Sequence, residues 1–166
     1  MIHWETVNDL LKESLLQLMK AEEFKDFRLV GGTALSLHRG HRMSIDIDLF
    51  TDEDYGSVDF ESIEKYLFKN FGYVDPGFGG IVGMGKSFVI GTDKENTIKL
   101  DVYYSNDKFI YNPILTNGIR LATVEDIIAM KLDVVLYGGR KKDFWDLHEL
   151  LPDYTISNMI TLHKQL

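Results

Sequence analysis

Acidic side chains interrupt a stretch that is otherwise patterned as a buried strand, SIDIDLF at residues 44–50. Residues two apart on a strand project from the same face, so Asp46 and Asp48 are expected to point together. The opposite face is expected to supply the core with Ile45, Ile47 and Leu49. Two neighbouring carboxylates repel each other unless a cation lies between them, and a hard divalent ion such as Mg²⁺ takes oxygen ligands. The pattern predicts either a metal site or the solvent-exposed face of an edge strand.

A third acid, Asp101, lies in a second alternating stretch, TIKLDVYY at residues 97–104. It is expected to share the polar face of that strand with Lys99 and Tyr103. The core face is expected to carry Ile98, Leu100 and Val102. If the two strands are neighbours in the sheet, three carboxylates converge on one spot. A two-metal site for phosphoryl transfer needs this arrangement, with ions about 3.5–4 Å apart.

Gly31 and Gly32 separate a predicted short strand, FRLV at 27–30, from a predicted helix, TALSLHR at 33–39, which Thr33 would cap. Glycines at such a position let the backbone approach a ligand closely, and the free N–H groups of a helix N-terminus favour a phosphate. An ordinary tight turn between a strand and a helix uses the same residues. The glycine pair alone is compatible with both interpretations.

A cation and an anion fall on the apolar faces of two predicted C-terminal helices. At about 100° per residue, Lys131 lies in the middle of the apolar stripe of 123–137. Asp143 lies in the apolar stripe of 140–151 together with Phe144, which is expected in the core. A lysine that faces a core is rare unless it is paired. The two side chains are therefore expected either to form an ion pair between the helices or to bind and orient a nucleotide phosphate.

Hydrophobic periodicity and turn residues predict the elements that must position these side chains. Helices are expected at 5–20, 33–39, 59–71, 123–137, 141–151 and 156–165, and strands at 27–30, 44–50, 81–90, 97–104 and 119–122. This order indicates an α/β (α+β) fold with a mixed sheet and a helical C-terminal part. We expect a single domain over 1–166, with the sheet core at about 25–121 and the C-terminal helices at about 123–166.

Composition limits the classes of function. The chain carries a formal net charge of −8, whereas a general nucleic-acid binder is expected to be basic, so contact with nucleic acid would need a local basic patch or metal ions. It has no cysteine, which excludes disulfides and cysteine nucleophiles and accords with a cytoplasmic protein. The amphipathic N-terminal residues differ from a signal peptide, and no apolar run reaches the roughly 20 residues of a membrane span. No membrane association is expected.

Taken together and in this order, the motifs resemble the nucleotidyltransferase superfamily, which has a DNA-polymerase-β-like fold. The shared signature is a glycine pair that opens a helix, a spacer, D-x-D on a strand and a third acid on a later strand. Within that superfamily the chain resembles the AbiEii/AbiGii toxin family of bacterial nucleotidyltransferases. GGTALSLHRGHRMSIDIDLF matches its first motif, and TVEDIIAMKLDVVLYGGRKKDFWDLHELL resembles its later motif of a helical lysine, an Arg/Lys cluster and D-x-x-D-L. The resemblance covers roughly residues 25–151.

The resemblance implies a mixed sheet flanked by helices and the transfer of a nucleoside monophosphate from a nucleoside triphosphate (NTP) to an acceptor. Asp46 and Asp48 would hold Mg²⁺ in a two-ion site. Asp101 would complete that site and act as a base on the acceptor hydroxyl. The nucleotide would be bound by Gly31, Gly32, Thr33, Arg42, Ser44, Lys131 and Asp143.

The resemblance also implies partners. The chain would be the toxin of a toxin–antitoxin or phage-defence pair, with a cognate antitoxin and with tRNA as an acceptor. Larger family members continue further beyond the D-x-x-D-L helix, and this chain is acidic, which argues against a platform for tRNA. A protein or a small molecule is therefore kept as an alternative acceptor. A non-catalytic module that binds a nucleotide or a protein is the alternative function.

Overall fold

The computed structural model describes residues 1–77 and 83–166, and these form a seven-stranded mixed sheet in the order β3-β4-β5-β2-β1-β7-β6. The strands are β1 (Arg28–Leu29), β2 (Asp46–Thr51), β3 (Tyr73–Asp75), β4 (Gly85–Gly91), β5 (Thr97–Tyr104), β6 (Ile114–Thr116) and β7 (Ile119–Leu121). β2 runs parallel to β5 and β1 runs parallel to β7, whereas the other pairs are antiparallel. The predicted mixed sheet is confirmed.

Six α-helices accompany the sheet in the described ranges. They are α1 (Asp9–Lys20), α2 (Gly31–Arg39), α3 (Phe60–Asn70), α4 (Val124–Leu136), α5 (Lys141–Leu150) and α6 (Ile156–His163). Four of them begin at a residue whose side chain accepts a backbone N–H, and these N-caps are Asn8, Asp59, Thr123 and Thr155. Across residues 1–77 and 83–166, none of the helices combines the length and hydropathy that a membrane crossing requires.

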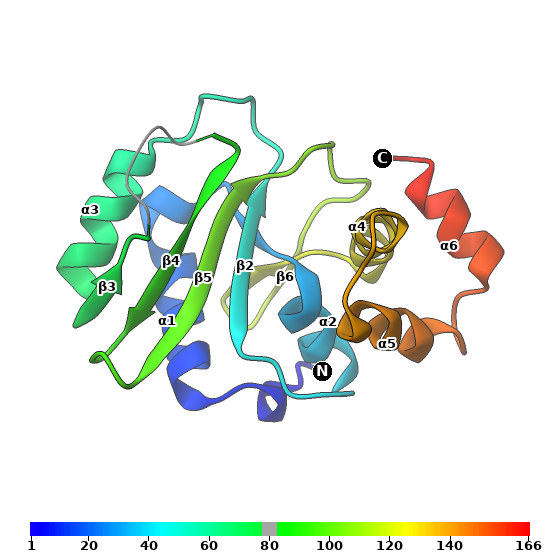
Figure 1. Cartoon of the computed structure of the whole chain (residues 1–166), viewed down its shortest axis with the longest axis horizontal. Helices are drawn as coiled ribbons and strands as arrows, with labels where there is room; N and C mark the ends of the chain where they lie inside the picture. Colours follow the sequence, from blue (N-terminus) through cyan, green and yellow to red (C-terminus); the bar gives the residue numbers. More distant parts are fainter. Residues whose placement is uncertain (78–82) are drawn as a thin grey trace.

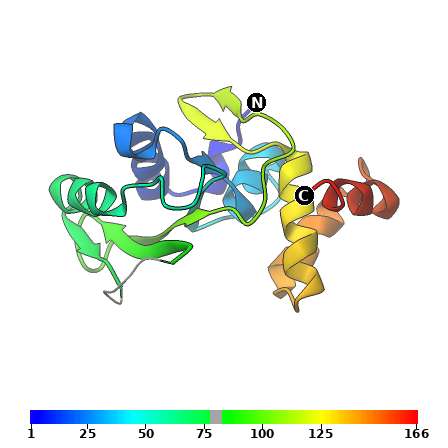
Figure 2. The ribbon, with the colours of Figure 1, turned by 90° about the horizontal axis from the view of Figure 1, so that it is seen from above.

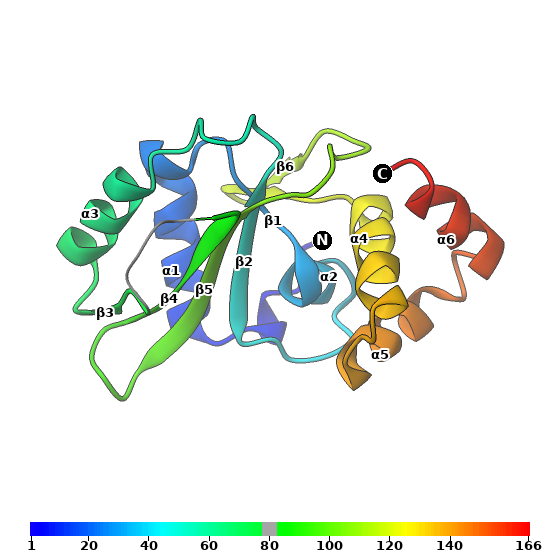
Figure 3. The same cartoon turned by 45° about the horizontal axis from the view of Figure 1, so that its top comes forward.

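The helices are arranged on one face and at one end of the sheet. α1 lies behind the strands in Figure 1, and α3 lies near the β3 edge. α4, α5 and α6 gather at the end of the molecule opposite α3, as the view from above shows (Figure 2). α2 lies between these helices and β2 (Figure 3). The predicted helical C-terminal part is present, and the extent of the domain over 1–166 stays a prediction.

Sequence patterns do not predict the two edge strands, β3 and β6, because three residues are too few to show alternation. β6 and β7 form a hairpin whose two connecting residues, Asn117 and Gly118, both have positive φ. That conformation matches the right-handed twist of a hairpin. β4 begins at Gly85, later than predicted, and positions 81 and 82 of the predicted strand lie outside the described residues.

The core follows most of the predicted alternation. Its buried strand residues include Ile47, Leu49, Ile98, Leu100 and Val102. The prediction for Ile45 is wrong: the side chain is 68% exposed, because β2 begins only at the next residue. The prediction for Phe144 is also wrong, since charged side chains occupy the inward side of α5 and leave this ring half exposed.

The first turn of α2 differs from the prediction. The helix begins at Gly31, and Val30 is its N-cap residue, so the predicted capping role of Thr33 is wrong. The Thr33 hydroxyl instead donates to the carbonyl of Asp46 and lies 2.7 Å from the hydroxyl of Ser44. These bonds tie the first turn of α2 to the start of β2, and both hydroxyl-bearing side chains are buried.

Arg120 on β7 connects the sheet to the end of α1 and to the segment that follows this helix. Its guanidinium donates to the carbonyls of Met19, Phe24 and Phe27 at 2.7–2.9 Å. Charge-assisted hydrogen bonds of this kind are stronger than neutral ones, and a planar guanidinium can serve three acceptors at once.

Replacing Arg120 with methionine is expected to lower the free energy of unfolding by about 3 kcal/mol, because three partly buried carbonyls lose their donor. Urea denaturation at pH 7.5 measures the change. Arg39→Met is the matched control, since Arg39 pairs with Asp153 at the surface and its loss should cost less than about 1 kcal/mol. Equal losses in the two variants would contradict a structural role for the three bonds.

Candidate active site

Three carboxylates lie on one face of two neighbouring strands. β2 pairs with β5 in parallel, and the register places Asp48 beside Asp101 and Asp46 beside Lys99. Residues 47 and 49, which alternate with the acids, are buried in the core, so the acids must point to the opposite face. The structure thus brings together the three acids that the sequence predicted to converge.

Asp48 is the innermost of the three acids. Burial raises the pKa of Asp48 to about 6, and the charges of Asp101 and Asp46 add to that rise. Lys99 and Lys142 oppose it only in part. In the absence of a further cation, the ionised form of this carboxyl is therefore unfavourable at the centre of the cluster.

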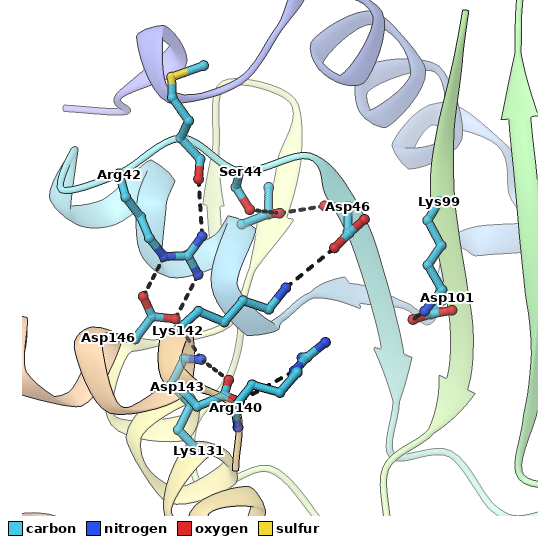
Figure 4. Close-up of polar contacts among 12 residues, drawn as sticks. Arg42, Ser44, Asp46, Lys99, Asp101, Lys131, Arg140, Lys142, Asp143 and Asp146 are labelled. Carbon is cyan, nitrogen blue, oxygen red and sulfur yellow. Dashed lines mark hydrogen bonds and ion pairs between the residues drawn. The ribbon is translucent and has the colours of Figure 1, made fainter. Parts of the chain in front are cut away.

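Lysines neutralise the two outer acids. The Nζ of Lys99 lies 2.6 Å from Oδ2 of Asp101, whose Oδ1 accepts a hydrogen bond from Ser87 at 2.5 Å. The Nζ of Lys142 on α5 lies 3.6 Å from Oδ2 of Asp46, and Figure 4 shows this lysine reaching across from α5 to β2. The sequence predicted no role for Ser87 and included Lys142 only within the Arg/Lys cluster, because only the tertiary fold brings these residues to the acids.

The donor set fits a hard divalent cation, since it consists of carboxylate oxygens around one acid that is costly to ionise. As the side chains stand, however, no three His, Cys, Asp or Glu residues in ranges 1–77 and 83–166 are grouped closely enough to hold a metal ion. The lysine contacts explain this, because two of the three acids are turned toward an ammonium group. Metal binding requires these contacts to rearrange.

The glycine pair lies directly beside the acids. Gly31 has a φ of +71°, and a Cβ at this position would come within 2.5 Å of Oδ2 of Asp48. A Cβ on Gly32 would collide with the guanidinium of Arg42. A side chain at either position would therefore displace a charged group of the site, and the N-terminus of α2 lies directly beside Asp48.

Lys131 is buried between two acids of α5. Its Nζ lies 3.0 Å from Oδ1 of Asp143 and 2.7 Å from Oδ2 of Asp146, and its side chain is only 6% exposed. The structure contains the ion pair between Lys131 and Asp143 that the sequence suggested. Asp143 also accepts the backbone N–H of Arg140, which fixes the start of α5.

Asp146 is a further residue of the site to which the sequence analysis assigned no role. Its carboxylate accepts two bonds from Arg42, at 2.7 and 2.8 Å, and it contacts Lys131 (Figure 4). It also accepts a bond from His41 at 2.8 Å. The available signal was the D-x-x-D spacing, which places both acids of α5 on the same helical face. Asp146 therefore connects α4 and α5 to the segment that leads into β2.

Opposed influences set the ionisation of Asp146. Burial alone would raise its pKa, but the hydrogen bonds from Arg42, His41 and Lys131 hold the pKa well below the usual range. The carboxylate is therefore charged at neutral pH and interacts with three side chains from two other parts of the chain, the segment before β2 and α4.

A pocket opens between the acids and α4. One side carries the three acids and the glycine pair, and the opposite side carries the apolar side chains of Ile127, Met130 and Val134. Lys142 and Arg140 lie at its α5 side. Such a pocket offers cations and backbone N–H groups for an anion and an apolar wall for a planar ring.

Asp48→Asn is expected to stabilise the metal-free protein by about 1–3 kcal/mol at pH 7.5, because a carboxyl with a raised pKa costs stability when it is ionised. The gain should shrink as the pH falls from 7 to 4, since the wild-type carboxyl is then protonated in the folded state. Thermal and urea unfolding in EDTA measure it. The exposed Asp107→Asn variant is the control, and a loss of stability in Asp48→Asn would contradict the prediction.

Asp146→Asn is expected to have the opposite effect, with a loss of about 3–5 kcal/mol at pH 7, because it breaks a buried charge network from one side. The pKa of this group is depressed in the folded state, so its contribution is fully present above about pH 4 and is lost progressively as the pH falls from there through the depressed pKa of the folded protein. Urea titrations at about pH 7 and about pH 2.5 test this. Asp153→Asn, which removes a surface pair, is the control and should change little at either pH.

Comparison with known proteins agrees with this geometry. A relative from Aquifex aeolicus (strain VF5), uncharacterized protein aq_aa25, is 30% identical over 142 residues, which are 84% of this chain and 65% of the relative. JHP933 from Helicobacter pylori superposes with a TM-score of 0.60 at 23% identity, over 87% of this chain and 64% of that protein. An antigenic nucleotidyltransferase-like protein from Paracoccidioides brasiliensis gives 0.60 at 18% identity, over 95% and 87%.

The chain thus spans about two thirds of the length of the first two relatives. The likeness to solved structures concerns the fold, because these identities are low. The sequence itself matches the nucleotidyl transferase AbiEii toxin family, of the type IV toxin–antitoxin system, over residues 13–165. Since this match includes the acids of both strands and the buried lysine, the chain belongs to the AbiEii family of nucleotidyltransferase toxins.

Proposed function

We propose that this protein is a Mg²⁺-dependent nucleotidyltransferase that moves a nucleoside monophosphate from an NTP to an acceptor. The observation that carries the proposal is the register of β2 and β5, which gathers Asp46, Asp48 and Asp101 beside the N-terminus of α2. Family membership supports the same reaction.

Each part of the nucleotide has a proposed place. Asp46, Asp48 and Asp101 would hold Mg²⁺, in a two-ion site, and the metal would neutralise charge on the phosphates and on the leaving pyrophosphate. The triphosphate would lie at the N-terminus of α2, where Gly31 and Gly32 leave the backbone open. The nucleoside base would lie against the apolar wall of α4.

The proposed reaction is a direct displacement at the α-phosphorus, without a covalent enzyme intermediate. The acceptor hydroxyl oxygen forms a bond to the α-phosphorus, the bond from that phosphorus to the bridging oxygen breaks, and pyrophosphate leaves. Asp101 accepts the proton of the hydroxyl. Ser87 fixes one oxygen of Asp101 by a 2.5 Å hydrogen bond, so the base has a defined orientation. Most of the rate enhancement would come from positioning and charge neutralisation.

The other predicted nucleotide-binding residues have proposed roles that follow from their contacts. Thr33 and Ser44 would keep the first turn of α2 in place through their mutual hydrogen bond. Arg42, Lys131 and Asp143 would position the same turn and α5 through the charge network around Asp146. These residues would thus affect nucleotide binding indirectly, by holding the elements that form the walls of the pocket.

For the acceptor we propose the unpaired end of an RNA such as tRNA. Phe144 and Trp145 expose their rings on α5, the helix whose first turn lines the pocket, and Lys141 lies 4.7 Å from the ring centroid of Trp145. Basic side chains interleaved with exposed rings suit a base that stacks while its phosphates are held. A protein or a small molecule is an alternative acceptor. As a family toxin of the cytoplasm, the protein would have a cognate antitoxin as partner.

A non-catalytic nucleotide-binding module is the second candidate. It is favoured by one observation, the pairing of Asp46 and Asp101 with lysines, which neutralises two of the three acids without metal. The two candidates differ in a single measurable property, the formation of a covalent product.

Transfer is tested by incubating the protein with each α-³²P-labelled NTP, Mg²⁺, and total tRNA, cell extract or a mixture of aminoglycosides. Label is expected on one acceptor. Asp101→Asn should slow transfer by about 10²–10⁴-fold, because it removes the base. Asp46→Ala combined with Asp48→Ala should abolish transfer, because both metal-binding acids are lost.

Asp93→Ala is the matched control, since Asp93 lies in an exposed turn and should leave transfer unchanged. Removing Mg²⁺ with EDTA should stop label incorporation, and restoring it should recover the product. If NTP binds in a Mg²⁺-dependent manner and yet no acceptor is labelled, the non-catalytic candidate is the correct one. Label that persists in the double variant would contradict the assignment of the site.

A further inference from the structure

The pocket contains more positive charge than the buried network uses. Two cations of the sequence motifs already form buried ion pairs. Lys131 lies between two carboxylates, and Arg42 donates through two nitrogens to Asp146. Moving either of them would leave a buried carboxylate without its partners. A nucleotide phosphate therefore needs a different cation.

Lys142 has the freedom that those residues lack. Its side chain is 38% exposed, and its ammonium lies 3.6 Å from Oδ2 of Asp46, beyond hydrogen-bond distance. Exposed pairs of this kind contribute little to stability. The backbone beneath it is fixed, because the N–H of Arg140 donates to Asp143 at the start of α5. The main chain of Lys142 is thus fixed, whereas its ammonium group is free to move.

Lys142 also lies between two competing anions. Its present partner, Asp46, is one of the acids proposed to hold the divalent ion. The N-terminus of α2, where the triphosphate is proposed to lie, packs against α5 and lines the same pocket. A divalent ion on Asp46 would repel the ammonium, while the phosphates would offer it new oxygen partners.

We infer that Lys142 is a mobile counter-ion that neutralises Asp46 in the empty site and moves to the nucleotide phosphates when a divalent ion takes Asp46. The inference rests on the proposed function, because the second position of the lysine needs a bound nucleotide. We assign this role to Lys142 rather than to Lys99, because the Nζ of Lys99 lies within hydrogen-bond distance of Asp101, at 2.6 Å on the same strand. A divalent ion on Asp101 would displace that contact as well.

The inference predicts two changes of opposite direction in one variant. Lys142→Met removes a competitor for Asp46, so Mn²⁺ should bind about two- to five-fold more tightly when no nucleotide is present. The same variant loses a phosphate contact, so nucleotides should bind about 10- to 100-fold more weakly in Mg²⁺. A residue that merely supported the fold would weaken both.

The measurements use the whole chain. Mn²⁺ binding is followed by electron paramagnetic resonance, and binding of the four α,β-methylene NTP analogues by calorimetry. Lys141→Met is the matched control, because it makes the same charge change on the adjacent residue, which lies over Trp145. Lys142→Arg should restore nucleotide binding. Thermal unfolding should be unchanged in all three variants.

The outcomes separate the two proposals. If Lys142→Met binds Mn²⁺ no more tightly than Lys141→Met, or binds nucleotides as well as that control does, the mobile counter-ion is wrong while nucleotide binding by the wild type still supports the proposed function. If the wild type itself binds none of the four analogues, the proposed function is contradicted. The proposed movement of Lys142 to the nucleotide is then contradicted as well.

Discussion

Repulsion among three carboxylates on one face of the sheet is the constraint around which this molecule is organised. The register of β2 and β5 fixes Asp48 next to Asp101, so the acids cannot separate without breaking the strand pair. Burial and mutual repulsion raise the pKa of the central acid to about 6. Lys99 on the sheet and Lys142 on α5 reduce this repulsion. The glycines at the N-terminus of α2 leave the space beside the acids free of side chains.

A second charge cluster holds the two halves of the pocket together. Asp146 binds the segment before β2 through Arg42 and binds α4 through Lys131. One wall of the pocket belongs to the sheet and the other to the C-terminal helices, so this carboxylate sets the width between them. The protein therefore uses one group of acids that is short of positive charge and another that is fully supplied with it. The first is suited to binding a ligand, and the second to holding the structure.

Most of the fold and the first half of the site could be predicted from local patterns. Alternation identified the strands that carry the acids, and helical periodicity singled out Lys131 and Asp143 as an inward-facing pair, because each pattern extends over several residues. The remainder depends on contacts between distant segments. The role of Lys142 follows from the place of α5 beside the sheet, and that of Ser87 from the pairing of β4 with β5. Three-residue edge strands have no periodicity to detect. Phe144 illustrates the limit of the helical wheel: the charge network, rather than hydrophobicity, determines which side of α5 faces inward.

The parallel pairing of β2 with β5 also affects when the site can exist. Parallel neighbours need a crossover connection, and here α3, β3 and β4 separate the first two acids from the third. Contacts between residues so far apart in the sequence form late, because the entropy of closing the intervening chain must be overcome first. A nascent chain that has not yet emerged through β5 has only two of its acids in place. The proposed site therefore cannot be complete until β5 has been synthesised and has paired with β2.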